Sequence, residues 1–470
     1  MSHHELDALQ AALNTALNSL RIAMDRSKLS PLSQHAVDMH PLDSMDHVTP
    51  NDIYEARRAA LACTTELKHL LQHPFEKTTE TALSMYNFVA VQVFIYHGIV
   101  DHMGTAPSGI SVDALQSELN LDSRKITTLL RYLSACGWVR EIQNGVFALN
   151  RSSRFLLRGQ RGRALMTHSN RMKIAEAVPR WFTHPEYKFS QSPSHTAFQL
   201  ACNTTKPFFE WLKDNKDVLG PFVANVDVNL SSALRLGCTT YGPQAFGEYA
   251  TPGILSDYPW ETCMGSTIVD CGGGNGNLAI SLANRFPGLR LIVQEREEMV
   301  VIAEANIKAH LNPNSADGTM VVEAHDFFTS QPHVGDNYTF MLRHVLHNWP
   351  EAQVVNILEN LAAAAGPKSK ILIIERVSGH FPVTHVQLEN NAGNTADVTT
   401  PVSLVGEQTI LNSSSLMPHA LTLHLLCILN AHERTLDQWR DMIVQAGLVI
   451  TGLYKLRAHV SILECRAIQT

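Results

Sequence analysis

Three short stretches of the chain contain histidines and carboxylates that could together form a general base. Leu342–Pro350 contains His344 and His347, Ile374–Arg376 contains Glu375, and His432–Thr435 contains Glu433. The first two stretches follow apolar runs that predict parallel strands, and ligands bind at the carboxyl ends of such strands. Carboxylates near His347 would raise its pKa and fix its tautomer, which suits removal of a proton from a hydroxyl. The alternative is that these are unrelated polar residues, each satisfied locally.

A glycine-rich turn lies about seventy residues earlier. The β-branched run Ile268–Asp270 predicts a buried strand, and apolar residues at helical spacing begin at Leu278. Between them stand Gly272, Gly273, Gly274 and Gly276. Such a turn lets the backbone approach a ligand and directs N–H groups at it. Glu295, nineteen positions after Gly276, stands where a nucleotide-binding fold places the carboxylate that holds ribose hydroxyls. A purely structural turn is the alternative.

From residue 266 onwards, predicted strands alternate with predicted helices, and these elements must position the residues above. The pattern predicts strands over 267–270, 289–294, 319–324, 337–343 and 369–377, and helices over 277–285, 298–309 and 351–364. Strand alternating with helix indicates a doubly wound parallel sheet in an α/β domain. Helices over 417–430 and 436–446 and two closing strands over 448–456 and 459–467 follow. The polar stretch 378–416 predicts a long exposed loop.

The amino-terminal half is predicted to be mainly helical. Helices are expected over 4–25, over 51–71 with Asn51 as N-cap, and over 81–100. Such helices commonly support dimerisation, although an ordinary helical core is the alternative. Over residues 109–150 the sequence predicts a helix, a turn, a second helix and a hairpin at Asn144-Gly145. This order is the winged-helix pattern. This unit has as many acids as bases and no basic face, which disfavours DNA binding.

From residue 156 to about 259 the chain reads as linking helices. The aromatic cluster Lys206–Leu212 in this region fits either a core or the lining of a substrate pocket.

Composition narrows the class of protein. A chain of 470 residues with 45% hydrophobic and 17% charged residues is globular and holds two to three domains. A net charge of −7 disfavours a polyanion partner, and the run Phe88–Val100 is too short and interrupted to cross a membrane. Eight cysteines without a C-x-x-C pair and 23 histidines without an H-E-x-x-H pattern predict neither disulfides nor a metal. The chain is expected to be a soluble cytoplasmic enzyme.

Four motifs, in this order, resemble the S-adenosylmethionine-dependent O-methyltransferases of the plant caffeic-acid type, in their fungal natural-product branch. They are Val269–Gly276, His325–Phe328, Leu342–Trp349 and Asn430–Thr435. The resemblance implies a Rossmann-like class I methyltransferase domain over 158–470 and a helical, winged-helix dimerisation domain over 1–157. It implies a homodimer that acts on a small molecule in secondary metabolism, bound to neither nucleic acid nor membrane.

The resemblance also assigns roles to residues. It implies that His347 is the catalytic base, flanked by Glu375 and Glu433, with Arg343 close to the reacting groups. The residues that it implies for the cofactor are Asp270, Gly272, Gly273, Gly274, Gly276, Glu295, Asp326, Phe327 and Arg343. S-adenosylmethionine would be held by its amino-acid part and ribose at the glycine turn and Glu295, and by its adenine at Asp326 and Phe327.

Two features depart from the family pattern. The family has aspartate where this chain has Asn348, and the stretch 378–416 is longer and more polar than expected. Both predict an unusual substrate pocket, which leaves a second reaction open. Some methyltransferase-like fungal proteins keep the cofactor and catalyse dehydration with Diels–Alder or Alder-ene cyclisation of polyketide pyridones. In such a pericyclase, Arg343, His344 or His347 would hydrogen-bond a developing oxyanion. A non-catalytic winged-helix regulator is the third hypothesis.

Overall fold

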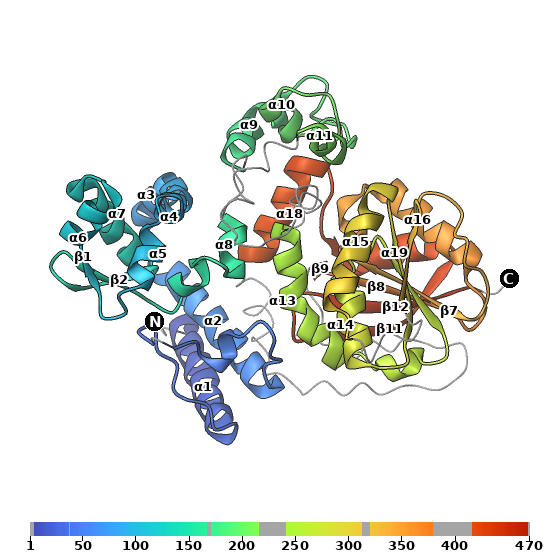
Figure 1. Ribbon diagram of the computed structural model, residues 1–470, viewed down its shortest axis with the longest axis horizontal. Helices are drawn as coiled ribbons and strands as arrows, with labels where there is room; N and C mark the ends of the chain where they lie inside the picture. The colour runs from blue at the N-terminus through green and yellow to red at the C-terminus, as the bar shows by residue number, and fades with distance from the viewer. Residues whose placement is uncertain are drawn as a thin grey trace. The chain divides into compact units, whose positions relative to one another are not determined.

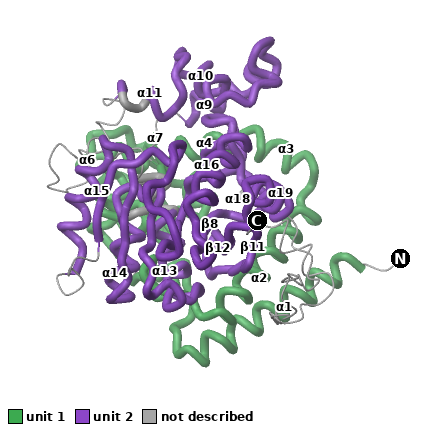
Figure 2. The backbone as a smooth tube through the Cα atoms, turned by 90° about the vertical axis from the view of Figure 1, so that its right-hand side faces the viewer, with its two compact units in different colours: residues 1–169, 217–229, 241–245 green, residues 170–216, 230–240, 246–470 purple. Residues whose placement is uncertain are grey.

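The computed structural model describes residues 4–36, 38–166, 171–215, 241–312, 320–378 and 416–468. The chain forms two compact units (Figure 2): the first contains residues 1–169 and 241–245, and the second contains 170–216 and 246–470. The predicted domain boundary after residue 157 stays a prediction. The greater part of the predicted loop over 378–416 lies outside the described residues.

The first unit is helical at its start and carries a small sheet further on. Its elements are α1 (His4–Arg26), α2 (Asn51–Leu71), α3 (Pro74–Leu83), α4 (Met85–Tyr96), α5 (Ile99–Gly104), β1 (Ile110–Ser111), α6 (Val112–Leu119), α7 (Ser123–Ala135), β2 (Val139–Gln143), β3 (Val146–Leu149) and α8 (Arg161–Met166). The helix–helix–hairpin order expected over 109–150 is present. Ser111 and Asp122 cap α6 and α7 with their side chains, and Gly145 takes a positive φ of 73° in the hairpin turn.

Two predictions about the first helices are wrong. The N-cap of α2 is Pro50, without a side-chain hydrogen bond, and Asn51 is the first helical residue. The single helix expected over 81–100 is divided among α3, α4 and α5. Gly98 separates α4 from α5 with φ 70° and ψ 11°, because a left-handed residue cannot continue a right-handed helix. Apolar residues stand on both sides of Gly98, so the hydrophobic pattern by itself did not reveal the bend.

The second unit is built on a seven-stranded sheet (Figure 1) in the order β11-β12-β8-β7-β4-β5-β6. The strands are β4 (Thr267–Cys271), β5 (Arg290–Glu295), β6 (Met320–Ala324), β7 (Tyr338–Arg343), β8 (Lys370–Glu375), β11 (Leu448–Lys455) and β12 (Ser461–Ala467). β4 to β8 pair in parallel, whereas β12 runs antiparallel between β8 and β11. The doubly wound sheet and its two closing strands are therefore confirmed.

Helices cover both faces of this sheet. α16 (Glu351–Ala364) and α19 (Leu436–Gln445) pack on one face, and α13 (Tyr241–Asp257), α14 (Asn277–Arg285) and α15 (Glu297–His310) pack on the other (Figure 1). Side chains alternate along a strand, so Ile371 and Ile373 of β8 enter the first core while Leu372 and Ile374 enter the second. Burial on both faces explains the continuous apolar runs of the parallel strands.

A third apolar cluster joins helices that are distant in sequence. α9 (Arg171–Thr183), α10 (Ala197–Cys202), α11 (Phe208–Asp214) and α18 (Leu416–Leu429) share it. The ring of Phe198 meets Phe208 and Trp211 edge to face, each at 5.2 Å between centroids. Part of the predicted aromatic cluster is therefore core. No helix in the described ranges is long and apolar enough to cross a membrane.

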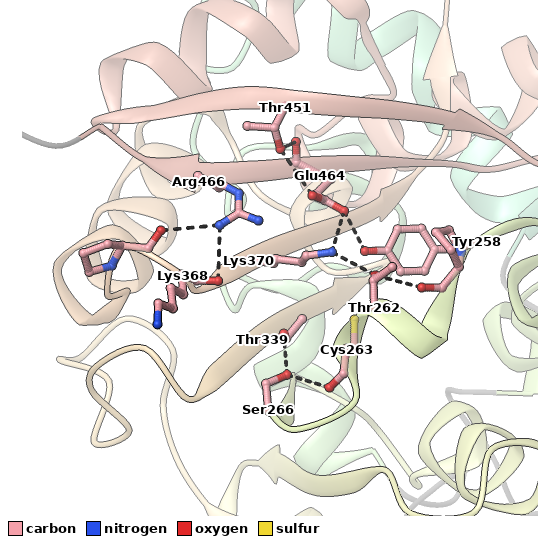
Figure 3. Close-up of polar contacts among 12 residues, drawn as sticks. Tyr258, Thr262, Cys263, Ser266, Thr339, Lys368, Lys370, Thr451, Glu464 and Arg466 are labelled. Carbon is pink, nitrogen blue, oxygen red and sulfur yellow. Dashed lines mark hydrogen bonds and ion pairs between the residues drawn. The ribbon is translucent and has the colours of Figure 1, made fainter. Parts of the chain in front are cut away.

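A buried polar network fixes β12 at the amino end of β8 (Figure 3). The hydroxyl of Tyr258 donates to Glu464 Oε2 at 2.7 Å, and Lys370 Nζ lies 3.2 Å from the same oxygen. Lys370 also donates to Thr262 at 2.9 Å. A carboxylate that is only 7% exposed needs such partners. Lys370 begins β8 and Glu375 ends it, so this network lies at the opposite end of the strand from the groups described next.

Candidate active site

Local structure brings His347, Glu375 and Glu433 together from three parts of the second unit. His347 lies in a short 3-10 turn, Leu346–Asn348, directly after β7, and Glu375 is the last residue of β8. A parallel pair of two-residue strands, β9 (Val377–Ser378) and β10 (Arg434–Thr435), aligns Arg434 with Val377. Since β9 follows Glu375 and β10 follows Glu433, this pairing places the two carboxylates beside each other.

Both carboxylates contact the same nitrogen of His347. Nδ1 lies 3.2 Å from Glu375 Oε2 and 3.3 Å from Glu433 Oε1. Glu375 Oε1 accepts the backbone N–H groups of Leu346 at 2.9 Å and His347 at 3.2 Å. Glu433 accepts a hydrogen bond from Nδ1, and the charge of Glu375 beside it further stabilises a proton there. Nε2 is then the nitrogen able to take a proton from a ligand.

Burial and charge oppose each other in this cluster. The exposed fractions are 8% for His347, 0% for Glu375 and 4% for Glu433. Burial alone lowers the pKa of His347, but the charge of Glu375 and the hydrogen bond and charge of Glu433 outweigh it and raise that pKa to about 9. Burial raises the pKa of Glu375 to about 7, although the charge of His347 opposes this change. The cluster therefore holds a proton at neutral pH.

His344 borders the same carboxylate. Its Nδ1 lies 3.9 Å from Glu375 Oε2, and its ring centroid is 5.3 Å from that of His347. The backbone of His344 has a φ of 55°, and Asn348 Nδ2 donates to its carbonyl oxygen at 3.0 Å. Burial, followed by the charges of His347 and His459, holds the pKa of His344 well below its ordinary value. This imidazole is therefore neutral beside a charged one.

Three of these groups also meet a distance criterion for a metal. His344, His347 and Glu375 each offer a ligand atom, and these atoms lie within 4.8 Å of one another. The charges of Arg343 and Arg376 reach the same place, because both lower the pKa of His344. The positive charges of these two guanidinium groups oppose the binding of a metal cation beside His344. The donor set fits a proton-binding cluster better than a metal centre.

The glycine turn is held by the end of the next strand. The N–H groups of Gly272 and Gly273 donate to the carbonyl of Gln294 at 2.9 and 3.2 Å. The N–H of Gly274 donates to Glu295 Oε1 at 3.2 Å, while Glu295 Oε2 accepts the N–H of Arg296 at 2.8 Å. Glycines 272, 274 and 276 have positive φ values of 73°, 62° and 78°. The structure thus places Glu295, the last residue of β5, against the turn that the predicted glycines form.

Asp270 leaves an unsatisfied carboxylate oxygen at this loop. The residue is 2% exposed, and its Oδ2 has no hydrogen-bond partner among the residues that the structure describes. Burial raises the pKa of Asp270 to about 7, with the charge of Arg343 opposing this change. A Cβ atom on Gly273 would lie 2.7 Å from that oxygen. A buried acceptor beside a glycine cradle fits a ligand that donates hydrogen bonds, such as an ammonium group.

Arg343, at the end of β7, adds a guanidinium whose charge acts on Asp270. Its Nη1 donates to Thr251 Oγ1 at 3.5 Å. Burial lowers the pKa of Arg343, whereas the charges of Asp270 and Glu248 raise it. A Cβ atom on Gly247 of α13 would lie 3.3 Å from the guanidinium, so helix and side chain are in close contact.

A series of aromatic side chains leads from the glycine turn to α11. A Cβ atom on Gly272 would lie 3.3 Å from the ring of Phe327, so this ring stands against the turn. Phe327 meets Trp349 at 6.0 Å, and Phe209 of α11 meets the same indole at 6.3 Å. The exposed Asp326 accepts the N–H of Phe328 at 3.0 Å. Trp349 and Phe209 are thus further candidates for lining the site.

Sequence reasoning missed one group that the structure adds. His459 lies in the turn between β11 and β12, and its ring stacks on His344 at 5.5 Å with 14° between the planes. No motif surrounds His459, and 84 positions separate it from Glu375 in the chain. Only the insertion of β12 beside β8 carries this turn towards the site.

Comparisons with known proteins find relatives among the O-methyltransferases. Residues 255–400 match the family model of the O-methyltransferase domain. The O-methyltransferase gedA of Aspergillus terreus is 25% identical over 443 residues, which cover 88% of this chain and 87% of that protein. The 3-O-methyltransferase 2 of Phanerochaete chrysosporium is 27% identical over 456 residues, covering 95% and 96%. The predicted resemblance to the O-methyltransferases is confirmed.

Solved structures match the fold of the chain. A pericyclic reaction enzyme and LepI in complex with SAM each align with a TM-score of 0.66, cover 88% of this chain and 94% of their own, and are 21% identical. At this identity the likeness concerns the fold alone. It confirms the class I methyltransferase architecture.

Proposed function

We propose that this chain is an S-adenosylmethionine-dependent O-methyltransferase that acts on a hydroxyl of a small aromatic or polyketide-derived molecule. The observation that carries the proposal is the pair of carboxylates on Nδ1 of His347, at 3.2 and 3.3 Å. This arrangement leaves Nε2 to act as the general base on the acceptor. General-base catalysis contributes roughly a hundred- to ten-thousand-fold to rate.

The cofactor site that we propose is the loop around the glycine turn. Asp270 offers its unsatisfied oxygen to the ammonium group, and Glu295 faces the turn where ribose hydroxyls would bind. Phe327 and Asp326 would lie against the adenine, and Arg343 near the carboxylate of the amino-acid part. When bound, S-adenosylmethionine supplies an electrophilic methyl group. The O-methyltransferase relatives and the LepI complex with SAM support this assignment.

The protein residues then perform two tasks. Glu375 and Glu433 orient His347 through Nδ1, and Nε2 takes the acceptor's proton as its oxygen becomes nucleophilic. Because the pKa of His347 is about 9, the free cluster is protonated at neutral pH. The base must therefore lose this proton before it can act, and activity should increase towards alkaline pH.

A second candidate is a methyltransferase-like pericyclase. The guanidinium of Arg343 and the neutral imidazole of His344 favour it, because such donors stabilise an oxyanion that develops during dehydration or cyclisation of a pyridone. The fold likeness to a pericyclic reaction enzyme is consistent with this reaction. We prefer methyl transfer because the two carboxylates that would orient a histidine base, Glu375 and Glu433, both lie beside Nδ1 of His347.

Calorimetry and product mass together test both functions. We expect the purified protein to bind S-adenosylmethionine and the Gly274→Asp variant to lose binding. Incubation with phenolic and pyridone acceptors should give a product heavier by one methyl group, with release of S-adenosylhomocysteine. A cyclised product of unchanged or dehydrated mass, with the cofactor unconsumed, would instead establish the pericyclase. Absence of cofactor binding would overturn both.

The remaining proposals concern assembly and location. We propose a homodimer through the amino-terminal helices, because large apolar side chains are exposed on α3 and α4, among them Phe75 at 72% and Tyr86 at 56%. Light scattering should give twice the mass of one chain; a monomer would refute it. The cytoplasmic location stays a prediction. Salt-dependent binding to DNA, which we do not expect, would revive the regulator hypothesis.

A further inference from the structure

The turn between β11 and β12 is fixed against α13. The N–H of Arg457 donates to Asp257 Oδ2 at 2.7 Å, and its Nε donates to Oδ1 at 2.9 Å. A Cβ atom on Gly253 of α13 would lie 3.0 Å from the carbonyl oxygen of Arg457. Leu456 and Val460, on either side of the turn, are buried in the sheet's second core. The position of His459 within this turn is therefore set by its surroundings on both sides.

His459 begins a row of rings that ends at the proposed base. Its ring stacks on His344 at 5.5 Å and 14°, and on Tyr249 of α13 at 6.1 Å and 14°. His344 in turn lies 5.3 Å from His347. The carboxy-terminal hairpin thereby contacts the catalytic cluster through one intermediate imidazole.

The imidazole of His344 competes with that of His347 for one oxygen of Glu375. Glu375 Oε2 lies 3.2 Å from Nδ1 of His347 and 3.9 Å from Nδ1 of His344. If His344 gained a proton, it would attract the carboxylate away from His347. Two imidazolium rings at this separation would also repel each other. The proposed base therefore keeps its carboxylate only while His344 is neutral.

The cationic groups around the two rings oppose a proton on either of them, whereas the neighbouring carboxylates Glu375 and Glu433 favour one. Arg343 at the end of β7, Arg376 after β8 and the charge of His347 all disfavour a proton on either imidazole, and Glu433 is the acid that favours one on His459. With burial as the largest cause, the pKa of His459 falls to about 4. His459 thus presents a neutral flat surface to His344.

We infer that His459 is a positioning residue, whose ring packs against His344 and thereby reserves the Glu375 carboxylate for His347. The inference rests on the proposed role of His347 as base. It concerns the proton on His347, however, which can be measured without cofactor or acceptor. Failure of the inference and failure of the proposed methyl transfer are therefore distinguishable.

The test is an NMR titration of the full chain labelled with ¹³C at histidine Cε1, with the His347→Gln spectrum as the assignment. We expect the midpoint of His347 to fall by about one pH unit in His459→Ala, because His344 then shares the carboxylate. His459→Phe retains a stacking ring and should keep the native midpoint. In the double variant His344→Phe/His459→Ala the competitor is absent, so the midpoint should return to the native value.

A second readout follows turnover once an acceptor is found. The acid limb of the kcat profile should move to lower pH in His459→Ala, by the same amount as the NMR midpoint, while KM for S-adenosylmethionine stays unchanged. An unchanged midpoint in His459→Ala, or an equal change in His459→Phe, would overturn the inference. If His459→Ala does not fold by circular dichroism, His459→Leu against His459→Phe makes the same comparison, since leucine fills space without a ring.

Discussion

The carboxylate of Glu375 holds His347 at two points. Oε1 accepts the backbone N–H of His347 at 3.2 Å, and Oε2 lies 3.2 Å from Nδ1 of its ring. One side chain at the end of β8 therefore fixes both the backbone turn and the orientation of the imidazole. This double contact explains how a residue in a three-residue 3-10 turn can be held with the accuracy that proton transfer requires.

Replacing the base should remove chemistry without removing the cofactor. We expect His347→Gln to lower kcat by roughly a hundred- to ten-thousand-fold, with the affinity for S-adenosylmethionine retained. Steady-state kinetics and calorimetry measure the two effects. His310→Gln, at the exposed end of α15, is the matched control and should leave both unchanged. A His347→Gln variant with native turnover would exclude His347 as base.

Stability and activity should respond to pH in opposite directions. The pKa of His347 in the folded chain, about 9, lies above its ordinary value of 6.5. Its stabilising contribution is therefore complete below about pH 6.5 and is lost as pH rises through 9, while the neutral base appears. Glu375, whose pKa is also raised, contributes with the same sign at lower pH.

Denaturant unfolding at several pH values checks this relationship. The free energy of unfolding should fall by about 1–3 kcal/mol more between pH 6.5 and 9 in the native chain than in His347→Gln. Equal slopes for the two proteins would show that His347 is not held protonated by the fold.

A methyl group at Gly273 should disturb the cofactor loop. Its Cβ would lie 2.7 Å from Asp270 Oδ2 and 2.9 Å from a methyl of Val293, so the loop or the carboxylate must move. We expect Gly273→Ala to weaken binding of S-adenosylmethionine at least tenfold, measured by calorimetry. Gly288→Ala is the control: its φ of 100° makes the substitution costly in stability, by about 1 kcal/mol, but nothing lies within 4 Å. Equal losses of affinity would contradict the steric explanation.

Removing the charge of Glu295 should weaken cofactor binding, whereas removing the charge of a nearby exposed glutamate should not. Glu295→Gln removes one acceptor of the Gly274 and Arg296 N–H groups and the carboxylate proposed for the ribose. Hydrogen bonds to charged groups contribute about 1.5–3 kcal/mol, so affinity for S-adenosylmethionine should fall roughly 10- to 100-fold. Glu297→Gln, exposed in the first turn of α15, should bind normally. Native affinity of Glu295→Gln would remove it from the site.

Neighbouring phenylalanines of α11 should behave differently. Both pack against the same apolar cluster, but Phe208 meets Phe198 whereas Phe209 also meets Trp349, two residues after His347. We expect Phe209→Ala to raise KM for the acceptor about three- to tenfold, with a smaller fall in Tm than Phe208→Ala causes. Phe208→Ala should lower Tm and leave KM unchanged. The reverse result would place Phe209 in the core.

Hydrophobic periodicity predicted the seven strands of the large sheet and the helices between them, but not β9, β10 or the bounds of the helices before residue 259. The helix over 351–364 and the closing strands are where the pattern placed them, within a residue or two, because these elements are long and strongly buried. Local pattern failed between α4 and α5, where a positive φ at Gly98 ends one helix within the stretch for which a single helix was expected. Periodicity reports which face is buried and carries no information about where a helix bends.

The sequence predicted which types of residue would take part in the chemistry, but not how they are arranged in space. Glycines followed by Glu295, and histidine followed by two distant acids, are local patterns that a single chain displays. That both acids meet Nδ1 of His347 depends on the pairing of β9 with β10. That His459 stacks on His344 depends on an antiparallel strand inserted beside β8. Strand order joins residues without regard to their separation in the chain, so only the tertiary structure decides these contacts.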